Sequence, residues 1–162
     1  MLDAIRSGRH QALLDAIPYV RHLGIRVLDG PADAPLRFFL PFRPELVGNS
    51  MLPALHGGAV GALLETAALV QVIVAEQQPR LPKLIDFSVD YLRSARARDC
   101  HAVCDVARRG SRIVAVTVRC WQEDPARPIA TARAHLLLVA NGAGAPESGG
   151  DRAPAMPEGE HP

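Results

Sequence analysis

The sequence of 162 residues is poor in aromatic side chains, lysine and cysteine, and it carries almost no net charge. Aromatic residues make up 4% of the chain, so the hydrophobic core must be built from Ala, Val, Leu and Ile. The formal net charge of +1 gives no general reason to expect a nucleic-acid partner. Hydrophobic residues at 48% and charged residues at 22% indicate an ordinary globular chain, long enough for one domain but not for two.

The cysteines are too few and too irregular for a disulfide framework. Cys100, Cys104 and Cys120 are odd in number, and their spacing fits no common zinc or redox motif. We expect buried free thiols in a reducing compartment. The first residues lack a long apolar core followed by a cleavage site, so they do not form a signal peptide. A cytoplasmic protein is therefore expected.

Breaker residues divide the chain into three parts. Residues 1–19 carry apolar side chains at loose helical spacing up to Pro18, which predicts an N-terminal helix stopped by that proline. Residues 20–140 form one domain. Residues 141–162 hold five Gly and four Pro but no aromatic or β-branched residue, and they are expected to be a disordered tail.

Within the domain, the hydrophobic pattern predicts one long helix and several strands. Residues 57–77 are Ala- and Leu-rich without proline and read as a helix, whereas residues 41–55 are interrupted by Pro, Gly and Asn and read as a loop. Strands are expected at 24–28, 36–40, 85–91, 101–109, 111–121 and 129–140. Runs of antiparallel strands with one segregated helix predict an α+β fold, with a single antiparallel sheet wrapped around the central helix.

The predicted helix is apolar on almost every side, which indicates burial rather than a surface position. A membrane span is disfavoured because Glu65, Thr66 and Gln71 all lie inside the segment. Between His56 and Glu76, Glu65 is the only ionisable side chain. Burial of an unpaired carboxylate costs several kcal/mol or raises its pKa. Glu65 is therefore either a functional group or a residue on an exposed face or in an arginine pair.

The helix begins with His56, Gly57 and Gly58, and this start suits an oxyanion. Glycines allow close approach of a ligand to the backbone, and the first-turn N–H groups have no helical acceptor. The helix dipole adds to this effect. Gly57 and Glu65 are eight residues apart, about 12 Å along one helix, so they cannot touch the same carbonyl. A site that uses both requires a dimer with antiparallel helices across a two-fold axis.

These residues also resemble a known family. The stretch LVGNSMLPALHGGA at 46–59, followed by Glu65, resembles the PaaI-like branch of the hot-dog-fold acyl-CoA thioesterases. The downstream segments DFSVDYLRSA at 86–95 and RRGS at 108–111 are similar too. The resemblance covers roughly residues 20–140 and implies a hot-dog fold, a homodimer or dimer of dimers, and an acyl-CoA substrate.

The resemblance also implies residue roles. Gly57 matches the residue whose N–H polarises the thioester carbonyl, and Glu65 matches the carboxylate that acts as base or nucleophile. His56 matches the motif histidine, which fixes the loop and helix start or transfers a proton. Asn49 resembles the amide that orients substrate or water, although its spacing to His56 is one residue longer than in relatives. The remaining substrate-binding candidates are Gly58, Thr66 and Ser88, and, for the CoA phosphates, Arg93, Arg96, Arg109 and Arg112. The alternative is that these arginines are solvated surface residues without a ligand.

One position departs from the family pattern. Relatives that use Glu often carry Ser or Thr one helical turn later, whereas this chain has Leu69. Thr66 or Ser88 would have to supply that hydroxyl.

We therefore predict an acyl-CoA thioesterase without a metal or a cofactor beyond the CoA of its substrate, because His56, Glu65 and Asp86 lack zinc-motif spacing. A hot-dog hydratase is a second enzymatic interpretation, but the helix carries no second histidine to pair with Glu65. A non-catalytic acyl-CoA-binding protein is a further alternative, and Leu69 favours it.

Overall fold

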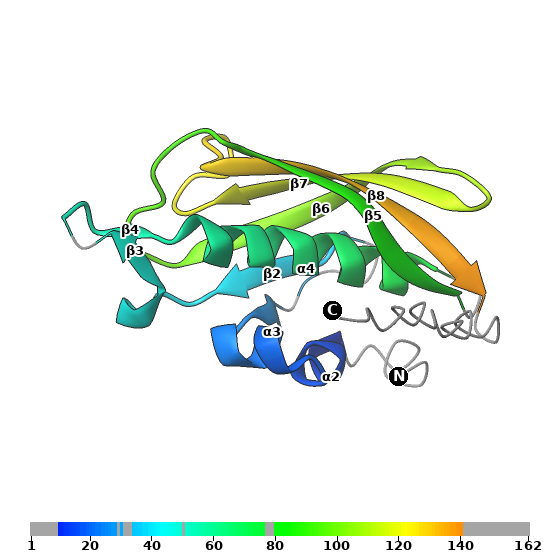
Figure 1. The fold of residues 1–162 in the computed structure, drawn as a ribbon, viewed down its shortest axis with the longest axis horizontal. Coiled ribbons are helices and arrows are strands. Elements are labelled where there is room, and N and C mark those ends of the chain that lie inside the picture. Colours follow the sequence, from blue (N-terminus) through cyan, green and yellow to red (C-terminus); the bar gives the residue numbers. More distant parts are fainter. Residues whose placement is uncertain (1–9, 29, 31–33, 50, 77–79, 141–162) are drawn as a thin grey trace, which may run out of the picture.

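The computed structural model describes residues 10–28, 30, 34–49, 51–76 and 80–140, and it shows the predicted α+β architecture (Figure 1). Six strands form one antiparallel sheet in the order β1-β2-β6-β7-β8-β5. The strands are β1 (Arg26–Leu28), β2 (Arg37–Leu40), β5 (Arg80–Tyr91), β6 (Cys100–Arg109), β7 (Ile113–Trp121) and β8 (Ala130–Ala140). The four consecutive strands after the central helix are those that the alternating pattern predicts.

Helix α4 (Gly57–Ala75) runs beneath the sheet, which curves over it (Figure 1). Leu63, Leu64, Ala67 and Ala68 are fully buried, and burial of each leucine side chain stabilises the fold by about 1.5–3 kcal/mol. By length and hydropathy α4 could also cross a membrane, as could no other helix in the described part of the chain. Because α4 packs against the sheet and the N-terminal helices, we describe it as a core helix.

Two short helices, α2 (His10–Asp15) and α3 (Pro18–Leu23), lie on the side of α4 away from the long strands (Figure 1). The sequence predicted one helix stopped by Pro18, but helix α2 ends at Asp15 and Pro18 begins α3. Proline is favoured at the first helical position because its missing N–H would have no acceptor there. Residues 1–9 of the predicted helix and the predicted disordered tail at 141–162 lie outside the described residues.

The segment predicted as loop, residues 41–55, contains three short elements. A 3-10 helix, η1 (Pro44–Leu46), is followed by strands β3 (Val47–Asn49) and β4 (Ala54–Leu55), which pair antiparallel. Strands this short give no hydrophobic period, and their breaker residues hide the pairing. An isolated bridge from Ala54 to Arg96 fixes this hairpin beside the start of α4.

Strand β5 lies at one edge of the sheet and is longer than predicted, because it continues back through Pro82. Proline is tolerated in edge strands, where one side of the backbone makes no ladder bonds. A register shift between Leu84 and Asp86 changes the alternation. Leu84 therefore packs on the core, while Ile85 is 54% exposed, although its alternation with Asp86 and Ser88 in the sequence suggests that it faces the core.

The three cysteines are buried and free, as predicted. Burial, with a smaller contribution from Asp105, raises the pKa of the Cys104 thiol to about 12. The thiol of Cys120 hydrogen-bonds to Cys100, which together with burial raises the pKa of Cys120 well above its ordinary value. The same hydrogen bond lowers the pKa of the Cys100 thiol, against the opposing effect of burial. All three side chains pack in the core.

Candidate active site

His56 caps the N-terminus of α4 with its side chain. Its Nδ1 accepts a hydrogen bond of 2.9 Å from the N–H of Gly58, so the ring proton is assigned to Nε2. The backbone N–H of His56 donates to the carbonyl of Leu46 at 2.7 Å. Gly48 lies directly against this histidine, because a Cβ at Gly48 would be 2.7 Å from the His56 Cα. The motif histidine therefore holds the loop and the helix start together.

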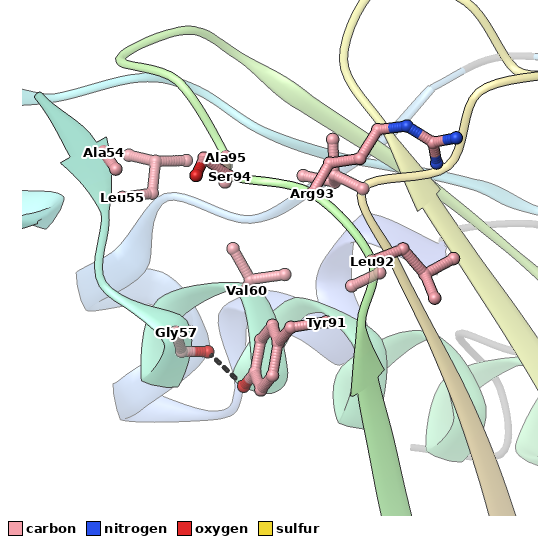
Figure 2. Close-up of a pocket in the computed structure, with 11 residues that line it drawn as sticks. Ala54, Leu55, Gly57, Val60, Tyr91, Leu92, Arg93, Ser94 and Ala95 are labelled. Atoms are coloured by element: carbon pink, nitrogen blue, oxygen red, sulfur yellow. Dashed lines mark hydrogen bonds between the residues drawn. The ribbon is translucent and has the colours of Figure 1, made fainter. Parts of the chain in front are cut away.

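Gly57 presents an unsatisfied backbone donor at this helix start. The described residues provide no acceptor for its N–H, whereas the next N–H along the chain is bonded to His56. The carbonyl of Gly57 accepts a 2.8 Å hydrogen bond from the hydroxyl of Tyr91 (Figure 2). The free N–H, the helix dipole and the absence of a side chain make this point suitable for a developing negative charge.

Glu65 lies two turns further along α4 and is half-buried rather than fully buried. It shares a face of the helix with Ala62 and Leu69, which are also half-buried, three residues before and four residues after it. Among the described residues, Glu65 has no hydrogen-bond or ion-pair partner, and no arginine neutralises it. A carboxylate without a partner beside apolar surface is available to accept a proton.

The hydroxyl groups expected near Glu65 are turned elsewhere. Thr66 is buried, and its Oγ1 donates to the carbonyl of Ala62 at 2.7 Å. Ser88 is exposed and stands opposite Arg133 in the ladder. Its neighbour Val89 packs toward the core, so by strand alternation Ser88 lies on the outer face of the sheet. Neither hydroxyl forms a hydrogen bond to Glu65 among the described residues.

Asn49 is used locally at the tip of the β3–β4 hairpin. Its Oδ1 accepts hydrogen bonds from the N–H groups of Met51 at 2.9 Å and Leu52 at 3.3 Å. The turn places both apolar side chains in solvent, with Met51 91% exposed. The amide nitrogen of Asn49 has no acceptor among the described residues and is the part of the side chain left for a substrate or a water.

A cleft of about 460 Å³ opens at the start of α4 (Figure 2). Gly57 and Gly58 stand at the helix start, and Gly57 borders the cleft itself. Its other walls come from β4, β5 and the segment before β8, and they include Leu55, Val60, Tyr91, Leu92 and Ile129. Arg93 and Ser94 complete the lining, so the cleft offers both apolar and polar contacts beside the free N–H, as a thioester with a polar carrier would need.

A basic groove of about 290 Å³ shares Arg93, Ser94 and Ile129 with this cleft. Its arginines are Arg93, Arg96, Arg98 and Arg127, and Glu123 and Asp124 oppose them, so the formal charge is +2. Gln122 joins the two loops of the groove, because its amide bonds to the backbone of Arg96 and Arg98. The groove therefore has a defined backbone frame.

The four guanidinium groups differ in how they are held. Arg93 donates to the carbonyl of Pro128 at 2.6 Å, and Arg98 forms an ion pair with Glu123. The side chains of Arg96 and Arg127 have no partner among the described residues. The sequence prediction identified Arg93 and Arg96 but missed Arg98 and Arg127. The cluster of three arginines in residues 93–98 was a usable signal for Arg98, whereas Arg127 is recognisable only from the fold.

Arg109 and Arg112 lie at the other end of the molecule. Arg109 bonds to Glu76 and to the carbonyl of Ala75, just past the end of α4. Arg112 lines a separate cleft of about 400 Å³ with Arg108 and His135. The four predicted phosphate-binding arginines are therefore split between two ends of the fold. No cluster of metal-ligand side chains occurs among the residues that the structure describes.

Comparison with known proteins identifies the family. The profile of the acyl-CoA thioesterase N-terminal domain matches residues 48–137, more than half of the chain. The medium/long-chain acyl-CoA thioesterase YigI of Salmonella typhimurium is 28% identical over 121 residues, covering 67% of this chain and 77% of that protein.

Solved structures share the fold. A protein from Chromobacterium violaceum is 35% identical, with a TM-score of 0.70, and the match covers 86% of this chain and 96% of that one. The PaaI protein of the E. coli phenylacetic acid degradation operon is 16% identical, with a TM-score of 0.71 over 85% of this chain and 95% of its own. At that identity the likeness concerns the fold alone. The chain belongs to the acyl-CoA thioesterases with a PaaI-like hot-dog fold, a family of thioester hydrolases.

Proposed function

We propose that the protein hydrolyses acyl-CoA thioesters in a site formed by two chains. The observation that carries the proposal is the pair of unsatisfied groups on α4: the Gly57 N–H at its start and the Glu65 carboxylate two turns later. A donor for an oxyanion and an acceptor for a proton are the two groups that thioester hydrolysis needs. Both groups lie on the part of α4 that the sheet leaves uncovered, so a ligand can reach them in an assembly that completes the site.

In the proposed reaction, Glu65 takes a proton from water while the water oxygen forms a bond to the thioester carbon. The carbonyl oxygen becomes negative and accepts a hydrogen bond from the Gly57 N–H. The C–S bond then breaks, the CoA thiolate leaves and takes up the proton held by Glu65, and the acid is released. Direct attack by the carboxylate is the other form of this proposal, and it uses the same two residues.

The two-chain site follows from the length of α4. Gly57 and Glu65 of one chain are about 12 Å apart along the axis, which is too far for one carbonyl. In a dimer with antiparallel α4 helices, the Gly57 N–H would face Glu65 of the partner subunit. Two features support this assembly: the half-buried face of Ala62, Glu65 and Leu69, and the edge of β5, beside which the described chain places no further strand.

We further propose that the basic groove binds the phosphates of CoA. It joins the cleft at Gly57, so one substrate could extend from the thioester to the nucleotide. Arg96 and Arg127 are the two free guanidinium groups and are suited to phosphate oxygens. Arg112 is the second candidate, because an antiparallel dimer would bring its cleft from the partner subunit.

The experiment for the proposed function is Glu65→Gln, assayed with short-, medium-, long-chain and aryl-CoA substrates. The amide keeps the shape of the side chain but cannot take the proton, so kcat should fall at least about 100-fold with KM much less affected. Asp105→Asn is the matched control, since Asp105 pairs only with Arg119 on the outer surface. Parent-level hydrolysis by Glu65→Gln would show that Glu65 is not the base or nucleophile.

A non-catalytic acyl-CoA-binding protein is the second candidate. Leu69 on the face of Glu65 favours it, as do the inward hydroxyl of Thr66 and the outward position of Ser88. This candidate predicts tight binding of acyl-CoA by the unmodified protein without turnover of any substrate in the panel. Calorimetric binding measured beside the hydrolysis assay distinguishes the two.

A further inference from the structure

Tyr91 is the last residue of β5, and it lies against the first turn of α4 (Figure 2). Its hydroxyl donates a hydrogen bond of 2.8 Å to the carbonyl of Gly57. A Cβ on Gly57 would be 3.3 Å from the phenol oxygen, and one on Gly61 would be 3.4 Å from it. The hydroxyl end of Tyr91 therefore lies beside both glycines, and Tyr91 also lines the cleft.

The peptide group between Gly57 and Gly58 is held from both ends by side chains. Its carbonyl accepts the hydrogen bond from Tyr91, and its N–H donates to Nδ1 of His56 at 2.9 Å. Hydrogen bonds on the two ends of one peptide polarise each other, so each strengthens the other. Both side chains approach from outside the helical ladder, one from β5 and one from the hairpin side of the helix start.

This double hold matters because two consecutive glycines have more backbone freedom than any other pair. An oxyanion donor is effective only when it already points to the place where charge develops. The Gly57 N–H belongs to the peptide just before the held one, and the two share the Cα of Gly57. A displacement of the Gly57 carbonyl would therefore change the backbone angles at Gly57, and with them the direction of the free N–H.

We propose that Tyr91 is a positioning residue for thioester hydrolysis: with His56 it holds the Gly57–Gly58 peptide, so that the Gly57 N–H points at the thioester carbonyl. This inference rests on the proposed function, and it assigns a role to a residue that the sequence analysis did not single out. The proton of Tyr91 is not transferred. Its contribution is the fixed direction of a neighbouring donor, needed in the transition state more than in the bound substrate.

The test is Tyr91→Phe, which keeps the ring against the glycines and removes one hydroxyl. Loss of one hydrogen bond that orients the oxyanion donor should lower kcat about tenfold and change KM by less than about twofold. Tyr19→Phe is the matched control, because Tyr19 is the other tyrosine of the chain and lies 58% exposed on α3. The control should retain the parent kcat.

A second measurement separates positioning from a general loss of structure. Amide hydrogen exchange of Gly58 should become faster in Tyr91→Phe, while amides in the second half of α4 keep their protection. A double-mutant cycle with His56→Ala should be non-additive, because both side chains hold one peptide. Additive losses would mean that the two residues act separately.

An unchanged kcat in Tyr91→Phe would overturn the inference, and so would an unchanged Gly58 exchange rate. A rise in KM alone would also overturn it, because it would make Tyr91 a substrate contact only. If the parent protein hydrolyses no thioester in the panel, the proposed function fails. The exchange measurement and its response to His56→Ala still decide whether Tyr91 holds the peptide.

Discussion

The two ends of α4 differ in whether their polar groups have partners. At the C-terminal end, the Glu76 side chain is 2% exposed and forms ion pairs with Arg80 and Arg109, each at 3.0 Å. Arg109 also donates to the carbonyl of Ala75, where a cation is favoured by the helix dipole. At the N-terminal end, the Gly57 N–H has no acceptor within the described chain, and the backbone there is two glycines. One end satisfies its polar groups and stabilises the fold, and the other keeps a donor for a ligand.

The largest expected loss of kcat comes from Gly57→Pro, which removes the unsatisfied backbone N–H at the start of α4. Proline has no N–H, it is favoured at the first helical position, and His56 before it already has the extended ψ of 131° that proline requires. We expect kcat to fall about 10²- to 10³-fold, the usual cost of one oxyanion donor. Gly57→Ala is the control, since it adds the same Cβ against Tyr91 but retains the N–H. Equal rates for the two variants would remove Gly57 from the mechanism.

The basic groove gives the next largest effect. Arg96→Gln combined with Arg127→Gln should raise KM for acyl-CoA about tenfold, because two contacts to phosphate are lost. The same variant should hydrolyse acyl-pantetheine, which has no nucleotide, with the parent kcat/KM. Arg119→Gln, a change of the same kind on the outer sheet surface, serves as the control. An equal loss on both substrates would place these arginines outside the CoA site.

At the C-terminal end of α4, Arg109→Gln should lower the stability of the fold and leave turnover unchanged. The buried Glu76 carboxylate would keep its ion pair with Arg80 but lose the one with Arg109, so unfolding should cost about 1–2 kcal/mol less. The measurement is denaturant unfolding, with kcat and KM of the folded enzyme in parallel. A higher KM for acyl-CoA at unchanged stability would instead support Arg109 as a phosphate ligand, which its place in the sequence had suggested.

The smallest effect, a change in the pH dependence of stability, is expected at His101 on β6, away from both ends of α4. Its ring lies between Phe39 and Trp121, and burial lowers its pKa, with Arg37 lowering it further and Asp99 opposing. As pH falls below the ordinary imidazole value of 6.5, the unfolded chain binds the proton first, so stability should fall slightly. His101→Gln should lose that part of the pH dependence. A parent protein that becomes more stable over this range would contradict the assignment.

The long helix and strands could be predicted from the sequence. Very short strands, and features that depend on contacts between distant segments, could not. The Ala- and Leu-rich run at 57–77 predicts α4, and the later strand patterns predict β6 to β8 to within about two residues at each end, whereas residues 80–84 of β5 were missed. Strands β3 and β4 are too short to show a period. The register shift in β5 that exposes Ile85 is set by pairing with β8, which no local pattern encodes.

The candidate site divides in the same way. His56, Gly57 and Glu65 were found because they are adjacent or alone in an apolar run. Side-chain direction was not predictable, so Thr66 and Ser88 were proposed as hydroxyls near Glu65 although one turns inward and the other outward. Tyr91 and Arg127 were missed because only the sheet brings their segments to the start of α4. The roles of all these residues stay predictions until the variants are measured.

The burial of α4 has a consequence for how the protein is made. Synthesis proceeds from the N-terminus at about 5–20 residues per second, and α4 is made before any residue of β5 to β8. This apolar helix therefore emerges from the ribosome before all the strands that cover it have emerged. Strand β2 also lacks one of its pairing partners at this stage, because β6 begins only at Cys100. The nascent chain therefore passes through an interval in which it should bind hydrophobic-surface chaperones, and this interval closes only when β8 has emerged.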